Sequence, residues 1–204
     1  MRVFLTGATG FIGSVLVKEL LQAGHQVLGM ARSDAGAQAL VAAGAQVHRG
    51  ELTDLDALRR GAAGADAVIH TAFIHDFSRF KENCEIDRRA IEALGAAAAG
   101  RPLLITSGTA AGSHQSGQIG LESDPPLSSD IMPRSASEEA GAAVAASGGD
   151  VRVIRLPQVH DTRRQGLVTY LISIAREKGL SAYIGNGANR SEEHTSELQS
   201  HHDL

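Results

Sequence analysis

The sequence predicts an α/β fold in which a parallel, doubly wound sheet of the Rossmann type carries helices on both faces, and three observations support this. Apolar runs typical of strands alternate with helical patterns along the chain, which is the order of βαβ units. Residues 67–73 are almost continuously apolar, as expected of a parallel strand buried on both faces. A glycine-rich turn stands between the first predicted strand and the first predicted helix.

The predicted elements alternate along the whole chain. Strands are expected where short apolar runs are bounded by turn residues, at residues 3–5, 26–31, 46–50, 67–73, 103–106, 151–155 and 181–184. Helices are expected in the segments that connect these strands, at residues 12–21, 35–43, 55–61, 77–99, 135–146 and 167–176.

Several helix boundaries carry recognisable capping residues. Gly24 and Gly44 follow the first two helical patterns, and glycine readily adopts the left-handed conformation that ends a helix. Thr53 or Asp54 can cap the N-terminus of the helix at 55–61. The segment 111–134 is rich in Ser, Gly, Pro and Asp and has no periodic apolar pattern, so we expect a long loop there, of a kind that is usually functional or mobile.

Length and composition restrict the class of protein. A chain of 204 residues suits one domain with a sizeable core. The hydrophobic content is 43% and no apolar run approaches membrane-spanning length, so a soluble protein without a membrane partner is expected. The N-terminus leads directly into a strand, which leaves no room for a signal peptide. The single cysteine, Cys84, excludes an internal disulfide and favours a cytoplasmic location; we interpret Cys84 as a helix-face residue.

The C-terminal residues are not interpreted as part of the fold. Residues 190–200, RSEEHTSELQS, resemble the translation of a widely used sequencing adapter, and we therefore treat 191–204 as a non-native tail. His194, His201 and His202 lie in this tail, so we predict no metal site from them. The tail carries four of the acidic residues and no basic one, so the net charge of −4 minus −4 leaves the remainder near neutral. No basic face then indicates a nucleic-acid partner.

The glycine-rich turn has the spacing of a phosphate-binding site. Gly7 permits a tight turn, Gly10 lets the backbone approach a pyrophosphate, and Gly13 lets the helix pack close to the strand. The helix that opens at this turn offers unpaired N–H groups and a partial positive charge to an anion. A strand before the glycines and a helix after them strengthen this interpretation.

The stretch TGATGFIG, led by Thr6, resembles the short-chain dehydrogenase/reductase superfamily, in particular its extended, epimerase/dehydratase-like branch, and the resemblance extends over residues 1–190. It implies an NAD(P)-binding domain over 1–190 whose C-terminal substrate lobe is truncated. It also implies an NAD(P)-dependent oxidoreductase or epimerase/dehydratase-like enzyme that acts on a small carbonyl or alcohol substrate. The cofactor-binding residues expected are Thr6, Gly7, Thr9, Gly10, Phe11, Ile12, Gly13, Arg32, Ser33, Glu51, Leu52, Thr71 and Ala72.

The end of the second strand favours NADP over NAD. In a dinucleotide fold an acid at this place binds the ribose 2′-hydroxyl, whereas an arginine accommodates a 2′-phosphate. Here Arg32 and Ser33 follow the strand, and no acid occurs before Asp34. The alternative is that Arg32 is an ordinary solvated side chain. Glu51 and Leu52 match the superfamily's adenine-contacting residues only loosely.

The usual catalytic pair of the superfamily, a tyrosine with a lysine four residues later, is absent. The only tyrosines are Tyr170 and Tyr183, and neither has that lysine. By the resemblance, Arg134 stands at the tyrosine place and Glu138 at the lysine place. Arginine stays protonated and is a poor proton donor, but it can bind a carboxylate, a phosphate or an oxyanion. An ordinary surface pair at i, i+4 is the alternative interpretation.

Other residues are candidates for the missing proton transfer. The superfamily places a catalytic hydroxyl after the fifth strand, where this chain has Ser107 and Thr109. The proton can also come from His75, from His160 or from water, and the sequence does not choose among them. A second hypothesis is a non-catalytic NADP(H) sensor that reports to a protein partner, and a third is an inactive truncated fragment. The oligomeric state is open.

Overall fold

The computed structural model describes residues 1–109, 121–157, 159–160, 166–183 and 185. The chain separates into two compact units, Met1–Ile154 and Arg155–Leu204, and each unit is described by itself. The predicted non-native tail lies outside the described residues and stays a prediction. Among the described residues, no helix combines the length and the apolar character needed to cross a membrane.

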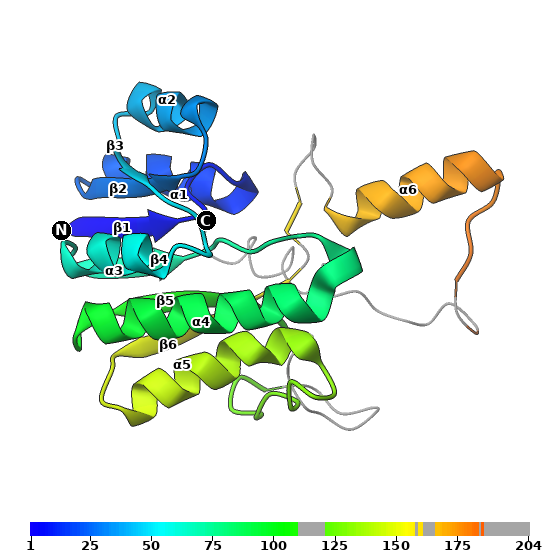
Figure 1. Ribbon diagram of the computed structural model, residues 1–204. Coiled ribbons are helices and arrows are strands. Elements are labelled where there is room, and N and C mark those ends of the chain that lie inside the picture. The colour runs from blue at the N-terminus through cyan, green and yellow to red at the C-terminus, as the bar shows by residue number, and fades with distance from the viewer. Residues whose placement is uncertain (110–120, 158, 161–165, 184, 186–204) are drawn as a thin grey trace. The chain divides into compact units, whose positions relative to one another are not determined.

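The first unit is built on a six-stranded sheet with the order β3-β2-β1-β4-β5-β6 (Figure 1). The strands of the sheet are β1 (Arg2–Thr6), β2 (Gln26–Ala31), β3 (Gln46–Arg49), β4 (Ala67–His70), β5 (Leu103–Gly108) and β6 (Val151–Leu156). The last two residues of β6 already belong to the second unit. The pairs β1–β2, β1–β4, β2–β3 and β4–β5 are all parallel, which confirms the predicted fold class. From β1, the strands β2 and β3 are added on one side and β4, β5 and β6 on the other, so the strand order reverses between β1 and β4.

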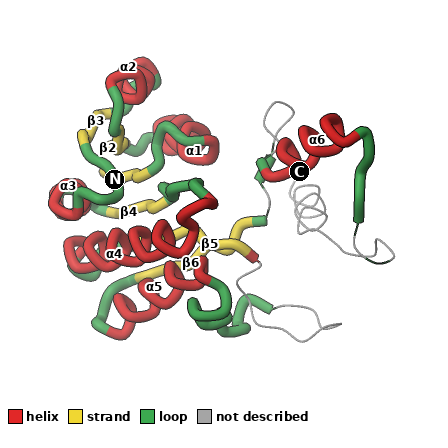
Figure 2. Tube along the Cα trace, turned by 45° about the vertical axis from the view of Figure 1, so that its right-hand side comes forward, coloured by secondary structure: helices red, strands yellow, loops and turns green. Residues whose placement is uncertain are grey.

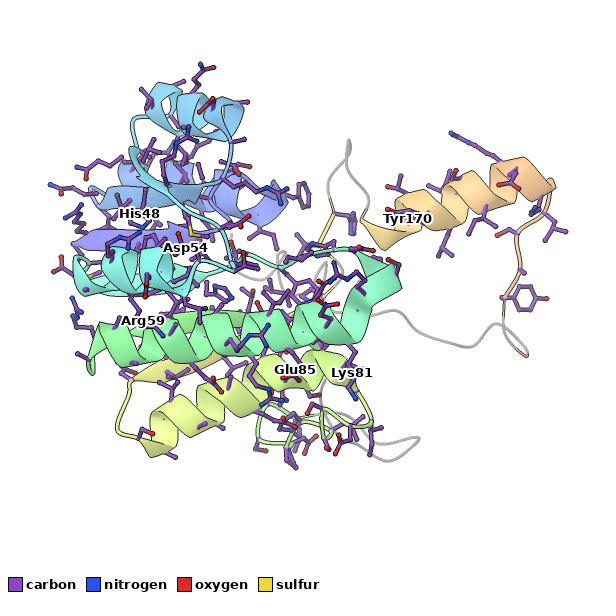
Figure 3. All side chains as sticks on the ribbon, viewed as in Figure 1. His48, Asp54, Arg59, Lys81, Glu85 and Tyr170 are labelled. Carbon is purple, nitrogen blue, oxygen red and sulfur yellow. The ribbon has the colours of Figure 1, made fainter. Side chains whose placement is uncertain are left out.

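Helices cover both faces of this sheet (Figure 2). The first unit contains α1 (Phe11–Gln22), α2 (Asp34–Ala42), α3 (Leu55–Ala63), α4 (Phe80–Ala98) and α5 (Ala136–Ala146), with short 3₁₀ turns η1 (Phe77–Arg79) and η3 (Pro133–Ser135) before α4 and α5. The second unit contains α6 (Leu167–Lys178), on which Tyr170 is exposed (Figure 3).

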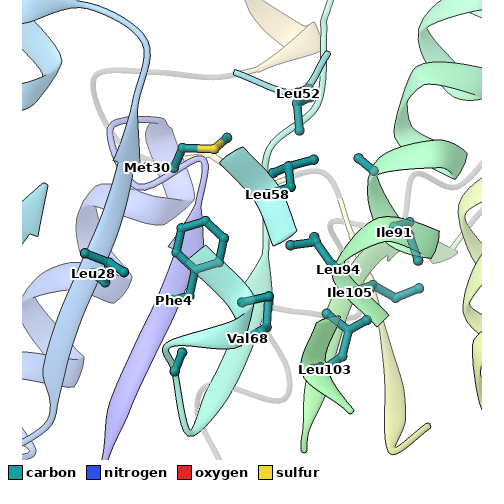
Figure 4. Packing of buried hydrophobic residues seen from close by; sticks show 14 of the residues in the cluster. Phe4, Leu28, Met30, Leu52, Leu58, Val68, Ile91, Leu94, Leu103 and Ile105 are labelled. Carbon is teal, nitrogen blue, oxygen red and sulfur yellow. The ribbon is translucent and has the colours of Figure 1, made fainter. Parts of the chain in front are cut away.

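Two hydrophobic clusters fix these helices to the sheet. The larger one centres on Phe4 of β1, which lies beside Leu28 of β2 and Val68 of β4 (Figure 4), and it includes residues of α3, α4 and α5. A Cβ atom on Gly61 of α3 would lie 2.3 Å from the Phe4 ring, so a glycine is needed where α3 crosses β1. The smaller cluster joins α1 and α2 to the opposite face of the sheet.

The predicted capping residues are confirmed in most cases. Asp54 Oδ1 accepts the Ala57 N–H at 2.9 Å and caps α3 (Figure 3). Thr53, the other candidate, instead donates its hydroxyl to Glu51 Oε1 at 2.8 Å. Gly24 and Gly44 both have positive φ, +79° and +88°, as the left-handed ends of α1 and α2 require.

Two predicted elements differ from the structure. No strand is present over the described residues 181–183, which are exposed, and Ile184 lies outside the described residues. An extended segment becomes a strand only when a neighbour completes its hydrogen bonds, and among the described strands none pairs with this segment. The fourth strand is also shorter than the apolar run, since β4 ends at His70.

The predicted loop before α5 is only partly described. Residues 110–120 lie outside the described residues, whereas 121–132 form turns without a helix. Ser129 in this loop donates its backbone N–H to Glu139 Oε1 at 2.8 Å, and Arg88 of α4 donates to Glu139 Oε2 at 2.6 Å. These contacts anchor the end of the loop to α4 and α5, directly before Arg134.

Candidate functional site

The glycine turn has a shape that side chains would block. Gly7 follows β1 with a φ of +69°, and a Cβ atom there would lie 2.7 Å from the backbone nitrogen of Ala72. A Cβ atom on Gly13 would lie 2.1 Å from the Gly7 carbonyl oxygen. The turn therefore packs backbone against backbone, and both positions require glycine.

The N-terminus of α1 is free to bind an anion. Gly10 is its N-cap, no side chain caps the helix, and its first turn contains no acid. The first N–H groups of an α-helix have no partner within the helix, and they carry a partial positive charge. Together with the glycine turn, this arrangement fits the pyrophosphate of a dinucleotide. Phe11 and Ile12 form the start of this helix.

This turn lies at the switch point of the sheet. Thr6 and His70 are register partners at the carboxyl ends of β1 and β4, which is where open α/β sheets bind ligands. The Thr71 hydroxyl donates to the Thr6 carbonyl oxygen at 2.9 Å, and the Ala72 N–H donates to Thr6 Oγ1 at 3.4 Å. Thr71 and Ala72 thus line the turn, and their contact with a cofactor stays a prediction.

A buried polar network begins directly beneath the turn. Thr6 Oγ1 lies 2.7 Å from His70 Nδ1, and His70 Nε2 lies 2.9 Å from Asp87 Oδ1. All three residues are almost completely buried. These partners are satisfied by the tautomer in which Nε2 carries the hydrogen and donates to the Asp87 carboxylate, while the Thr6 hydroxyl donates to Nδ1.

Asp87 connects this network to the tyrosine place. Its Oδ2 accepts Arg134 Nη1 at 3.0 Å and the Ser137 hydroxyl. Burial by itself raises the pKa of Asp87, but the His70 ring, the Arg134 guanidinium and the Ser137 hydroxyl outweigh it and hold this pKa below its ordinary value. Asp87 is therefore an ionised carboxylate with a partner on each oxygen.

Arg134 is held on several sides and is not a surface residue. Its Nη1 also donates to Ser137 Oγ, and its Nη2 donates to the Thr106 carbonyl oxygen at 3.0 Å. The guanidinium carbon lies 4.3 Å from the centre of the Phe73 ring. Glu138 is only 5% exposed. The alternative of an ordinary surface pair between Arg134 and Glu138 is wrong, because Arg134 turns inward to Asp87, on α4.

The two predicted catalytic hydroxyls lie at the carboxyl end of β5. Among the described residues, the buried hydroxyl oxygens of Ser107, Thr109 and Ser135 have no hydrogen-bond partner in the protein. Buried hydroxyls normally have a partner. Ser107 and Thr109 therefore have free bonding capacity one and three residues after Thr106, whose carbonyl binds Arg134.

Sequence reasoning missed His70, Asp87 and Ser137. A signal for Asp87 was available, because Cys84, Asp87, Ile91 and Leu94 lie on the buried face of α4, and a charged residue on such a face needs a buried partner. No signal in the sequence identifies which partner it has.

Arg32 and Ser33, the residues expected to contact the ribose and its 2′-phosphate, directly follow β2. Ser33 caps α2 by accepting the Gly36 N–H at 3.1 Å, while Arg32 is exposed. Asp34 pairs with Arg49 of β3. Thr9 is close to this group, since a Cβ atom on Gly36 would lie 3.1 Å from Thr9 Cγ2.

The remaining candidates are more scattered. Glu51 accepts the Thr53 hydroxyl, and Leu52 is buried in the larger core cluster. His75 is exposed and stands edge-on to the Phe73 ring, with centroids 5.3 Å apart. His160 is exposed in the second unit. The described residues contain no group of three or more His, Cys, Asp or Glu side chains able to hold a metal.

Comparison with known proteins gives a family match and several relatives. A family model described as NAD(P)H-binding matches residues 7–180. An uncharacterized protein of Schizosaccharomyces pombe is 46% identical over 196 residues, and one of Saccharomyces cerevisiae is 39% identical over 194 residues. Each match covers 93% of this chain and 64% of the relative, so the chain spans less than two thirds of their length.

Solved structures show the same fold. The NAD complex of a UDP-glucose 4-epimerase from Thermus thermophilus superposes with a TM-score of 0.69 at 24% identity, covering 89% of this chain and 64% of that one. A double mutant of the dTDP-glucose 4,6-dehydratase DesIV from Streptomyces venezuelae, with NAD bound, superposes with a TM-score of 0.70 at 25% identity, covering 93% and 66%.

Proposed function

Because the chain belongs to the NAD(P)H-binding family of oxidoreductase- and epimerase-like proteins, we propose that it is an NADP(H)-dependent oxidoreductase or epimerase/dehydratase-like enzyme that acts on a small carbonyl or alcohol. The observation that carries the proposal is the backbone cradle of the glycine turn. Gly7 and Gly13 leave no room for a Cβ atom, and the N-terminus of α1 has neither a side-chain cap nor an acid in its first turn.

The residues around the end of β2 support NADP over NAD. Arg32 is exposed and can pair with a 2′-phosphate. Asp34, the first acid after β2, already pairs with Arg49 and is a poor candidate to bind ribose hydroxyls. In this proposal Ser33 and Thr9 assist at the same phosphate, and Glu51 and Leu52 lie on the adenine side.

Ser107 and Thr109 are proposed to bind the substrate oxygen. Their hydroxyls have no hydrogen-bond partner within the described part of the chain, so each can donate to a substrate carbonyl or accept from a substrate alcohol. When bound, the nicotinamide cofactor supplies or removes a hydride, and the chain's own residues bind and orient the substrate.

Two measurements on the purified protein test the proposal. Calorimetric titration with NADPH and with NADH should show binding of both and tighter binding of NADPH. Consumption of NADPH should then be followed against a panel of small aldehydes and ketones. Absence of binding by either dinucleotide would refute the proposed function, and binding without turnover would reduce it to the alternative below.

That alternative is a non-catalytic NADP(H) sensor. It is favoured by one observation: the positions of the usual tyrosine and lysine hold Arg134 and Glu138, and Arg134 pairs with Asp87. A sensor requires that NADP⁺ and NADPH change the affinity for a protein partner unequally, because only differential binding shifts an equilibrium. Equal effects of both forms would exclude the sensor, and turnover of any carbonyl in the panel would make it unnecessary.

A further inference from the structure

We propose that Arg134 binds an anionic oxygen of the substrate and that Asp87, itself held by His70, is the positioning residue that sets the orientation of the guanidinium. This inference rests on the proposed function for its substrate, a carbonyl whose oxygen gains negative charge in the reaction. Neither Asp87 nor His70 belongs to the site that the sequence indicates.

An arginine at the tyrosine place can bind an oxygen that gains negative charge, but it cannot act as the proton donor. A guanidinium remains protonated under all ordinary conditions, so Arg134 cannot transfer a proton as a tyrosine would. When a carbonyl accepts a hydride at carbon, its π electron pair moves to oxygen. Arg134 supplies a fixed positive charge and N–H donors to that oxygen, and water supplies the proton that converts the alkoxide to the alcohol.

Arg134 has more N–H donors than its described contacts use. A guanidinium has five N–H groups in a rigid fork. Three of them are used: Nη1 donates to Asp87 and to Ser137, and Nη2 donates to the Thr106 carbonyl oxygen. Nε–H and one N–H of Nη2 have no protein acceptor among the described residues. The side chain is 21% exposed, and in this proposal the two unused donors are the ones that bind the substrate oxygen.

The positive charge of Arg134 is balanced by the buried carboxylate of Asp87. This compensation lowers the cost of holding the guanidinium out of water. The N–H donors of Arg134 that its contacts leave unused can still bind an anionic oxygen, such as that of a carboxylate. These fixed donors do more for an oxygen whose negative charge grows in the transition state, because only such an interaction accelerates a reaction.

Hydrogen bonds to both carboxylate oxygens hold Asp87 in one orientation. Its Oδ1 accepts from His70 and its Oδ2 from Arg134 and Ser137. His70 in turn contacts Thr6, the last residue before the glycine turn. The buried side chains of Asp87, His70 and Thr6 therefore connect Arg134 to the strand that leads into the proposed cofactor cradle.

The competing interpretation is a structural ion pair that only fastens η3 and α5 to α4. It requires the same contacts, but it predicts that no N–H of Arg134 responds to an added anion. The two interpretations can be separated in the protein without cofactor or substrate, so the result does not depend on whether the proposed enzymatic activity exists.

The experiment is NMR spectroscopy of the protein labelled with ¹⁵N-arginine. The Nε–H and Nη signals of Arg134 are assigned by their disappearance in Arg134→Lys. Sodium acetate is the probe for an anionic oxygen, and acetamide and sodium chloride at equal concentration are the controls. We expect a saturable shift of the Arg134 Nε–H signal with acetate only. Arg88 of α4 is the matched control, because it pairs with Glu85 of α4 and with Glu139 of α5. Its Nε–H signal should not shift with acetate.

Positioning is tested by the Nη signals. In the wild type, bonds to Asp87 and Thr106 should slow rotation of the guanidinium and keep these signals separate, whereas in Asp87→Asn they should merge. If Asp87→Asn does not fold, His70→Asn, which removes the anchor of the other carboxylate oxygen, provides the same comparison. An unresponsive Nε–H signal, or Nη signals already merged in the wild type, would overturn the inference. Failure of the dinucleotide titration would refute only the proposed function.

Discussion

Thr6 Oγ1 and His70 Nδ1 lie 2.7 Å apart at the ends of two adjacent parallel strands. They mark the place where the sheet changes its direction of growth, directly below the glycine turn. Since His70 also contacts Asp87, which binds Arg134, one buried hydrogen-bonded chain joins the proposed cofactor cradle to the position of the missing tyrosine.

Gly10→Ala should weaken dinucleotide binding with little loss of stability. A Cβ atom there would meet only the Gly7 carbonyl oxygen, at 3.0 Å, but it would occupy the space through which a pyrophosphate approaches the backbone. We expect a loss of affinity for NADPH of at least about tenfold, which corresponds to about 1.4 kcal/mol, measured by calorimetry. The control is Gly24→Ala, which has a positive φ of +79° and no neighbour within 4 Å. It should cost about 1 kcal/mol of stability and leave affinity unchanged.

Arg32→Asp should reverse the preference between the two dinucleotides. The substitution removes the proposed partner of the 2′-phosphate and adds an acid that can bind ribose hydroxyls. The ratio of the dissociation constants for NADPH and NADH is the measurement. Arg59→Asp is the control, because Arg59 pairs with Asp56 on α3 (Figure 3). An unchanged ratio in Arg32→Asp would show that Arg32 is only a solvated side chain.

Asp87→Asn should destabilise the protein by about 3–5 kcal/mol near pH 7, because it leaves a guanidinium without its buried partner. The folded-state pKa of Asp87 is lowered, so its ionisation contributes stability above the unfolded-state pKa. That contribution is lost as the pH falls through the still lower folded-state pKa. In urea unfolding, the difference between wild type and variant should therefore narrow below about pH 4.

The matched control for Asp87→Asn is Asp56→Asn, which breaks an exposed pair with Arg59. Such pairs are worth about 0–1 kcal/mol, so this variant should stay close to the wild type at every pH. Equal destabilisation by both substitutions would contradict the buried network.

Cys84 should react slowly with thiol reagents in the folded protein. Burial raises the pKa of its thiol to about 11, so little thiolate exists at neutral pH. Because this folded-state pKa lies above the unfolded one, the stabilisation is complete below about pH 9 and is lost as the pH rises towards 11. Cys84→Ala should remove this alkaline loss of stability. Rapid modification of native protein at neutral pH would contradict the burial of Cys84.

Ser107→Ala should reduce turnover while leaving stability almost unchanged. Its hydroxyl has no hydrogen-bond partner among the residues that the structure describes, whereas a substrate oxygen bound by it would lose a donor. If a carbonyl substrate is found in the panel, kcat should fall more than about tenfold. Ser147→Ala is the comparison, because Ser147 is the exposed C-cap of α5 and its hydroxyl donates to the Ala143 carbonyl oxygen at 3.0 Å. Full activity in Ser107→Ala would leave Thr109 as the proposed hydroxyl.

Local chemistry made much of the fold predictable from the sequence. Asp54 caps α3, and Gly24 and Gly44 end α1 and α2, because each of these roles depends on neighbouring residues in the chain. The predicted strand at 181–184 failed for the opposite reason: an extended apolar segment is a strand only if a distant segment pairs with it.

By itself, the sequence determined the alternating parallel architecture and the glycine turn, because the period of apolar residues and the need of Gly7 for a positive φ are written in short stretches of chain. Only the tertiary structure decided what Arg134 contacts. Its partner Asp87 lies 47 residues earlier on another helix, and an ion pair between them follows from how α4 and α5 pack, a long-range relationship that no local pattern encodes.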